Sequence, residues 1–137
     1  MILRDNIFLE KLLLESEGGN LTEADIAEYR RPFLTPGEDR RPTLTWPRQL
    51  PFDGQPPEVV EVVAKNAEWM QASPVPKLWI KGHPGGIMTG TETVAFCERV
   101  PNQTSATVKG FHFLQESSGP EVGAALAEFV RGLRGQS

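Results

Sequence analysis

The chain has 137 residues, of which 39% are hydrophobic and 23% are charged, a composition that supports one packed domain and excludes a wholly disordered chain. Its formal net charge is −4 with scattered Lys and Arg, which argues against nucleic acid as a partner, and no apolar run reaches the ~18 residues of a membrane span. Because the first residues lack a secretory-signal pattern and the single Cys97 can form no internal disulfide, we expect a cytoplasmic protein without a membrane partner.

Two helices are predicted in the first thirty residues. Apolar residues spaced mostly three to five apart predict an amphipathic helix over residues 2–15. No residue before this helix can cap it, which indicates a helix cut from something longer. After turn-forming residues at 16–20, Thr22 followed by Glu23 and Asp25 predicts a short helix over residues 22–30, which Pro32 ends.

Residues 31–57 contain seven prolines and no sustained hydrophobic period, so we expect little regular structure there. A disordered linker would rarely contain many large apolar side chains. We therefore expect this segment to be ordered and packed through Phe33, Leu44, Trp46, Leu50 and Phe52.

The remainder of the chain alternates helices with strands. The pattern predicts a helix from Pro57 to Ser73, a strand over 76–82, a turn over 83–86, a helix over 91–99, a strand over 105–109, a loop over 111–119 and a helix over 120–133. This order implies two parallel strands with a right-handed crossover. Since parallel sheets are buried on both faces and usually have more strands, the chain looks like one edge of a larger α/β sheet.

His112 is the first candidate for catalysis because it follows a predicted strand, and ligands bind at the carboxyl ends of strands in open α/β sheets. A neutral imidazole there can act as a general base, although a histidine that packs or caps a loop is an equally good interpretation. His83 follows the other strand, but no carboxylate or thiolate has ligand spacing with the two histidines, so we expect a loop residue and no metal site. Cys97 lies within a predicted helix, and we expect it to be buried and inert.

Five segments of the chain form a specific set when taken together: residues 41–51 (RPTLTWPRQLP), residues 73–77 (SPVPK), Pro84-Gly85, Pro101-Asn102 and residues 110–116 (GFHFLQE). In these segments the sequence resembles haloalkane dehalogenases of the α/β-hydrolase fold. The resemblance runs in order from Asp5-Asn6-x-Phe8-x-Glu10 to the last helix, and it is closest to the hexachlorocyclohexane-pathway group. Renilla-type luciferases share much of the pattern.

The resemblance implies that this chain is the C-terminal part of such a fold. Residues 1–45 would be the end of the helical cap and its connection to the core, and residues 46–137 the last two parallel strands with their flanking helices. His112 matches the catalytic histidine, Phe113 the aromatic residue beside it, and Gly86 and Ile87 match access-tunnel positions. Trp46, Pro47 and Leu50 match positions that line the halide and substrate pocket in that family.

The family's nucleophilic Asp, the Trp beside it and the halide-binding Asn fall outside this chain, as does the triad acid. Residues 16–20 replace an apolar, Pro-containing stretch that edges the tunnel mouth in relatives. The resemblance implies hydrolysis of a small halogenated aliphatic substrate with water and release of halide, with no cofactor or metal. Two alternatives stay open, a coelenterazine-luciferase-like oxygenase and a non-catalytic fragment or binding protein. We also expect a missing N-terminal half or self-association, and an isolated chain without turnover.

Overall fold

The computed structural model describes residues 1–17 and 19–135, and the chain divides into two compact units between Trp69 and Met70. The two units are described in turn. The predicted division at residues 45 and 46 refers to the cap and core of a longer fold, and it stays a prediction.

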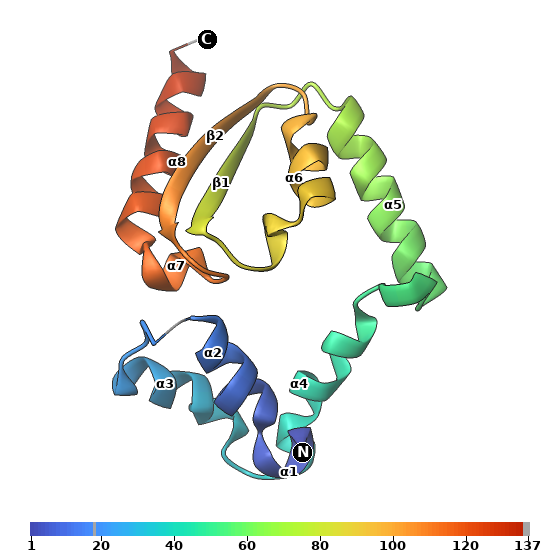
Figure 1. Cartoon of the computed structure of the whole chain (residues 1–137), viewed down its shortest axis with the longest axis vertical. Helices are drawn as coiled ribbons and strands as arrows, with labels where there is room; N and C mark the ends of the chain where they lie inside the picture. Colours follow the sequence, from blue (N-terminus) through green and yellow to red (C-terminus); the bar gives the residue numbers. More distant parts are fainter. Residues whose placement is uncertain (18, 136–137) are drawn as a thin grey trace. The chain divides into compact units, whose positions relative to one another are not determined.

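The first unit consists of short helical segments joined by turns (Figure 1). In chain order they are α1 (Ile2–Asp5), the π-helical η1 (Phe8–Leu13), α2 (Leu14–Ser16), α3 (Glu23–Arg30), η2 (Arg31–Phe33), η3 (Glu38–Arg40), α4 (Arg41–Thr45), η4 (Pro47–Gln49) and η5 (Phe52–Gly54), followed by the start of α5 (Pro57–Ala72). The expectation of little regular structure over residues 31–57 is therefore wrong, because this segment forms successive short helical turns. Its prolines start three of them, at the first or second position.

The helix predicted over residues 2–15 is interrupted at Asn6. This residue has φ 52° and ψ 35°, a left-handed conformation that Asn tolerates better than most residues. Its backbone N–H donates to the carbonyl of Ile2 (2.9 Å) and ends α1, while its own carbonyl accepts from Leu9 and Glu10 (3.0 Å each). The break needs only one residue, so the hydrophobic spacing on either side of it continues. The uncapped start is confirmed, since Met1 makes no capping bond.

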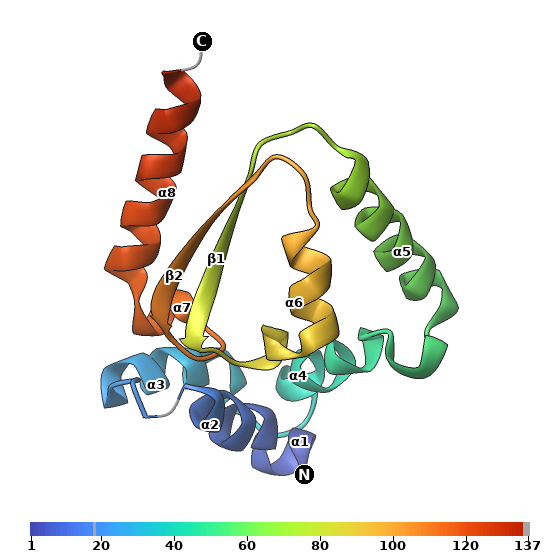
Figure 2. The same cartoon turned by 45° about the horizontal axis from the view of Figure 1, so that its top comes forward.

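The prediction of a helix that begins at Thr22 is confirmed by a capping box. The Thr22 side chain accepts from the backbone N–H of Asp25 (3.2 Å), and the Asp25 carboxylate accepts from the backbone N–H of Thr22 (2.9 Å). The hydrogen bonds from Thr22 lower the pKa of Asp25. Figures 1 and 2 show α3 beside α2.

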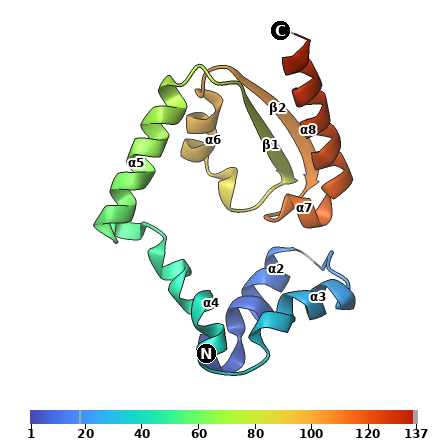
Figure 3. The same ribbon diagram turned by 180° about the vertical axis from the view of Figure 1, so that it is seen from behind.

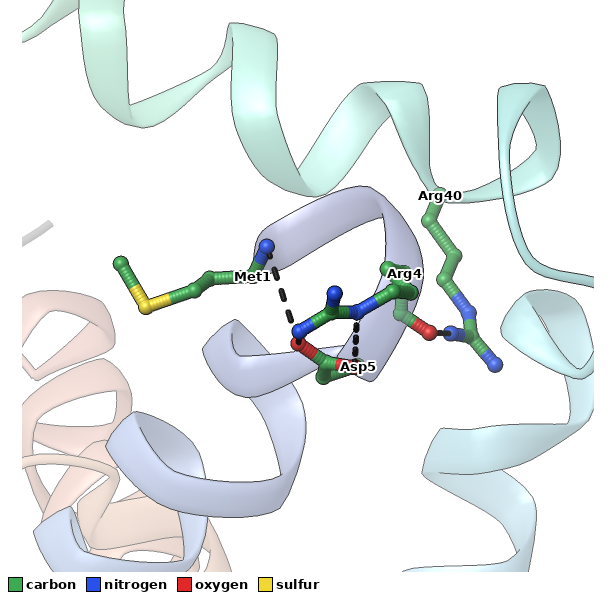
Figure 4. Close-up of polar contacts among 4 residues, drawn as sticks. All are labelled: Met1, Arg4, Asp5 and Arg40. Carbon is green, nitrogen blue, oxygen red and sulfur yellow. Dashed lines mark hydrogen bonds and ion pairs between the residues drawn. The ribbon is translucent and has the colours of Figure 1, made fainter.

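Arg40 links several turns of the first unit through hydrogen bonds. Its guanidinium donates to the carbonyls of Phe33 (2.8 Å), Leu34 (3.1 Å) and Arg4. Figure 4 shows the bond to Arg4 and, beside it, the Asp5 carboxylate that accepts from the Arg4 guanidinium (2.7 and 2.9 Å). These bonds satisfy carbonyls of irregular backbone that no helix partner reaches.

The expectation that residues 31–57 are packed is only partly right. Phe33 and Leu44 are half-buried, but Trp46 (62% exposed), Phe52 (72%) and Leu50 (38%) lie at the surface. Of the described hydrophobic residues in the first unit, only Leu9 and Leu13 are buried. So small an interior cannot enclose large aromatic side chains.

The second unit is built on two parallel strands, as the sequence predicts. β1 (Lys77–Pro84) pairs with β2 (Gln103–Gly110) in a register that sets Trp79 opposite Ser105. Helix α6 (Thr91–Glu98) joins the strands after the turn η6 (Ile87–Thr89), and α8 (Gly119–Arg134) follows β2. Figures 1 and 3 show α8 along one side of the strands and α6 on the other. The predicted loop over residues 111–119 contains one short helix, α7 (Leu114–Ser117).

Lys77 connects the two loops that precede the strands, at the amino end of this sheet. Its ammonium group donates to the carbonyls of Ser73 (2.8 Å), Val75 (2.9 Å) and Pro101 (3.1 Å), and Asn102 donates from its amide to the carbonyl of Pro74 (2.5 Å). The two loops that precede the strands are therefore joined by side-chain bonds to backbone carbonyls.

Helix α5 has the bounds that the sequence predicts, and none of its residues is buried. Val62, Val63 and Trp69 are between 48% and 56% exposed. Among the described residues of the second unit, the buried hydrophobic residues are Val100 and Val108, and Cys97, expected to be buried, is half-buried. Among the described residues, no helix is both long and apolar enough to cross a membrane.

Candidate functional site

The two strands end side by side, and the loops that follow them are joined by backbone contacts. Pro84 and Gly110 are opposite each other in the register, and the N–H of Gly85 donates to the carbonyl of Gly110 (3.0 Å). Gly85 has φ +84°, a conformation that favours glycine, and it turns the chain at this point. Figure 3 shows both strands ending at α7.

Gly86 brings the first loop against His112. A β-carbon built on Gly86 would lie 3.0 Å from Cα, 3.1 Å from Cβ and 3.2 Å from the backbone nitrogen of His112. These distances are shorter than ordinary van der Waals contacts, so only a residue without a side chain fits without displacement. The candidate residues Gly86 and His112 are therefore neighbours through their backbones.

The loop that carries His112 is closed by Ser118. This residue is 4% exposed, and its hydroxyl donates to the carbonyl of Lys109 in β2. Its backbone N–H donates to the carbonyl of Leu114 (2.8 Å), and its carbonyl accepts from Val122 (2.9 Å) in α8. Both ends of the loop are thus fixed to regular structure.

The imidazole of His112 is exposed and lies edge-on to Phe113, with ring centroids 4.5 Å apart and planes at 67°. In the described part of the chain it has no side-chain hydrogen bond, so backbone contacts and this ring contact define its place. An accessible imidazole at the carboxyl end of parallel strands can accept a proton from water. Ile87, 75% exposed, follows Gly86 in η6.

The other candidate residues, Trp46, Pro47 and Leu50, belong to the first unit. Trp46 contacts Phe8 edge-to-face, with centroids 6.3 Å apart and planes at 79°, and its indole is exposed. Pro47 begins η4 and Leu50 follows it. The structure thus brings together Gly86, His112 and Phe113, and the pocket roles of Trp46, Pro47 and Leu50 stay predictions.

His83 lies opposite Lys109 in the register and is exposed. In the ranges 1–17 and 19–135, no group of three or more His, Cys, Asp or Glu side chains could hold a metal ion. The expected tunnel-mouth segment, residues 16–20, includes residue 18, which lies outside the described residues. Sequence reasoning missed the roles of Gly85 and Ser118. Glycines directly after a strand indicate that another stretch of backbone approaches closely there. No comparable pattern in the sequence marks Ser118.

The chain is similar to haloalkane dehalogenases along nearly its whole length. The haloalkane dehalogenase of Sphingobium indicum is 50% identical over 134 residues, which are 98% of this chain and 45% of the relative. That of Mycolicibacterium smegmatis is 46% identical, over 98% of this chain and 43% of the relative. The crystal structure of the haloalkane dehalogenase DbeA from Bradyrhizobium elkani has a TM-score of 0.90 at 34% identity, and it covers all of this chain and 47% of that one.

A luciferase is also a relative. The coelenterazine h 2-monooxygenase of Renilla reniformis is 36% identical over 132 residues, which are 95% of this chain and 42% of the relative. No protein-family model matches the chain. The chain spans less than half the length of these relatives, and the part it matches is their C-terminal half. Its fold is accordingly that of the C-terminal part of an α/β-hydrolase of the dehalogenase type, as the sequence predicts.

Proposed function

We propose that this chain supplies the general base and part of the substrate pocket of a haloalkane dehalogenase whose nucleophile lies in residues that the chain does not contain. The observation that carries the proposal is the joining of two loops at the carboxyl ends of β1 and β2, where Gly86 lies against His112. The similarity to dehalogenases at up to 50% identity supports the same activity.

The reaction would proceed in two steps. A carboxylate of the complementary part would displace halide from carbon and form an alkyl ester. His112 would then take a proton from a water molecule, and the resulting hydroxide would attack the ester carbonyl, releasing the alcohol and regenerating the carboxylate. Its exposed imidazole and fixed backbone suit this role, because a general base must meet water in a defined orientation.

The remaining candidate residues would have the pocket and tunnel roles that the resemblance assigns to them. Trp46, Pro47 and Leu50 would contact halide and substrate, and Gly86, Ile87 and Phe113 would border the space beside the base. The substrate would be a small halogenated aliphatic compound. A cytoplasmic location belongs to the same proposal, because a chain with one unpaired cysteine suits a reducing compartment.

A luciferase-like oxygenase is the second candidate function. The Renilla relative supports it, at lower identity than the dehalogenases. Light emission with coelenterazine distinguishes it from halide release with 1-bromobutane.

The test is a fusion of the unmatched N-terminal part of the Sphingobium indicum dehalogenase to this chain. We expect the fusion to release halide continuously from 1-bromobutane. His112→Asn should release about one equivalent of halide per protein and retain the alkyl group as an ester, visible as a mass increase of the intact protein. General-base catalysis is typically worth about 10²–10⁴-fold, so the ester should accumulate.

The matched control is His83→Asn, which changes the other histidine of the chain and should leave multiple turnover intact. Continued turnover by His112→Asn, or equal loss in both variants, would remove His112 from the role. Light from coelenterazine without halide release would favour the second candidate function.

A further inference from the structure

Two glycines near the carboxyl ends of β1 and β2 leave space on one face of the sheet. Gly82 lies opposite Val108 in the parallel register, and Gly110 is two residues beyond Val108 on β2. Because residues two apart on a strand point to the same face, Gly82 and Gly110 belong to one face of neighbouring strands. No side chain rises from either position. We call the space at these two residues the glycine notch.

The side chain of Leu114 fills the glycine notch. A β-carbon built on Gly82 would lie 2.7 Å from Cδ2 of Leu114, and one built on Gly110 would lie 2.9 Å from the same atom. Real β-carbons essentially never come within 3.0 Å of another heavy atom, so Leu114 in this position excludes a β-carbon from both strand residues. The structure of this face therefore depends on a leucine that comes after both strands.

Both ends of the short helix α7 contact the glycine notch. Leu114 is its first residue, and Ser117, its last, lies against Gly110, with Cβ 3.5 Å from the place of a β-carbon there. The Ser117 hydroxyl is buried and has no hydrogen-bond partner among the described residues, so it acts by contact alone. A helix of four residues is too short to be stable without tertiary contacts, and these contacts fix it to the sheet.

The helix is in turn close to the candidate base. Leu114 follows His112 by two residues, and its carbonyl accepts a hydrogen bond from the N–H of Ser118 (2.8 Å). Phe113, between them, contacts the imidazole edge-on with ring centroids 4.5 Å apart. The contact with Gly86 restrains the His112 backbone from the first loop only. Leu114 restrains the same segment from the side of the sheet.

We propose that Leu114 is a positioning residue, whose side chain in the glycine notch holds the turn after His112 so that the imidazole keeps its orientation toward water. The inference rests on the proposed function for the reaction, whereas the orientation of the imidazole can be measured without it. A misplacement of about 1 Å can cost a catalytic group about 10²-fold in rate, so a contact two residues away is close enough to matter.

The first test is Leu114→Ala in the fused enzyme, which empties the notch. We expect ester hydrolysis to slow by about tenfold or more, while halide release in the first turnover changes by less than about twofold. The alkyl ester should then accumulate as a mass increase of the intact protein. Leu114→Met refills the notch at similar volume and should restore ester hydrolysis. The matched control is Leu126→Ala, at a leucine of α8 that is 52% exposed, and it should change neither step.

Gly82→Ala tests the same contact from the other side and keeps the leucine. Its methyl group would lie 2.7 Å from Leu114 Cδ2 and 3.1 Å from the carbonyl oxygens of Gly110 and Phe111, so it should also slow ester hydrolysis. Gly123→Ala is the control, because a β-carbon there would have no neighbour within 4 Å. Equal slowing of halide release and ester hydrolysis in Leu114→Ala, or no rescue by Leu114→Met, would overturn the inference.

Nuclear magnetic resonance of the imidazole measures its placement without the reaction. The Phe113 ring should shift the ring-proton signals of His112, which the His112→Asn variant assigns. We expect this shift to be lost in Leu114→Ala and kept in Leu126→Ala, and unchanged signals in Leu114→Ala would overturn the inference. Signals that depend on Leu114 in a fusion that releases no halide would uphold the inference and refute the proposed function.

Discussion

The α-carbon of Gly86 faces the backbone of His112 so closely that a β-carbon on Gly86 would lie 3.0 Å from His112 Cα. Two loops from different strands therefore fix each other's position without any side-chain bond. The histidine that we propose as the base depends on the size of a residue 26 positions earlier in the sequence.

Gly86→Val in the fused enzyme should displace the backbone of His112 and slow ester hydrolysis by about tenfold or more, because misplacement of a catalytic group is costly. Single-turnover kinetics with 1-bromobutane, which follow ester decay separately from halide release, measure the effect. The control is Gly90→Val, since the only contact of a β-carbon there would be Thr93 at 3.8 Å. Unchanged ester decay in Gly86→Val would show that the contact does not position the base.

Trp46→Ala should weaken substrate binding or alter halide release, raising KM by about tenfold, and should leave the rate of ester hydrolysis unchanged. The expectation follows from the proposed pocket role of the indole, which is held against Phe8. Phe52→Ala, at an exposed aromatic residue of the same segment, is the control. A defect of Trp46→Ala confined to ester hydrolysis would contradict this division of roles.

The isolated chain should show no dehalogenase turnover and should be oligomeric, aggregated or molten. Its buried hydrophobic residues within the described ranges are Leu9, Leu13, Val100 and Val108, whereas many large apolar side chains are exposed. About 300 Å² of apolar surface left in water forfeits about 7 kcal/mol, comparable with the net stability of a domain. Size-exclusion chromatography, thermal unfolding and halide assays check this; a monomer with a sharp transition and turnover would refute it.

The ion pair between Glu10 and Arg30 should stabilise the fold only at pH values at which the Glu10 carboxyl is ionised. The Arg30 guanidinium donates to both Glu10 oxygens (2.9 and 2.6 Å), and these hydrogen bonds lower the pKa of Glu10 below its ordinary 4.5. A lowered carboxyl pKa stabilises the fold above the unfolded pKa, and the contribution is lost as pH falls through the folded pKa.

Glu10→Gln should therefore lower the free energy of unfolding of the fused enzyme near pH 7, and the difference from the parent should shrink below about pH 4.5. Denaturant unfolding at several pH values measures it. Glu28→Gln is the control, because the Glu28 and Arg31 side chains are 73% and 76% exposed and their pair is screened by water. An equal difference at every pH would mean that Glu10 acts through something other than its charge.

The regular elements were largely predictable because their signals are local. Thr22 with Asp25, the proline that begins α5 and the apolar run of β1 each determine structure within a few residues. The break at Asn6 was not predictable, since one residue in a left-handed conformation leaves the hydrophobic spacing intact. Helix α7 is a single turn of four residues, too short for a period to show.

The residues of the candidate site stay predictions, and the way the chain arranges them could not be predicted from the sequence. The position of His112 after a strand and its match to a family motif select it from two histidines. The contact with Gly86 depends on the register of β1 and β2, and the bond from Ser118 to Lys109 joins residues across a folded loop. Neither follows from spacing along the chain. The expected burial of Trp46 and Phe52 failed because the sequence does not show how large an interior the chain can build.

The hydrogen bond from the Ser118 hydroxyl to the carbonyl of Lys109 joins the two ends of the ten-residue segment that contains His112. This bond and the strand and helix on either side of the segment define the backbone conformation of the segment. The backbone geometry around the proposed base is therefore set within this stretch of sequence, whereas the carboxylates of the proposed reaction would come from residues that this chain does not contain. The catalytic groups of the proposed reaction would thus come from two different parts of the enzyme, whereas the backbone position of the imidazole would depend on this part alone.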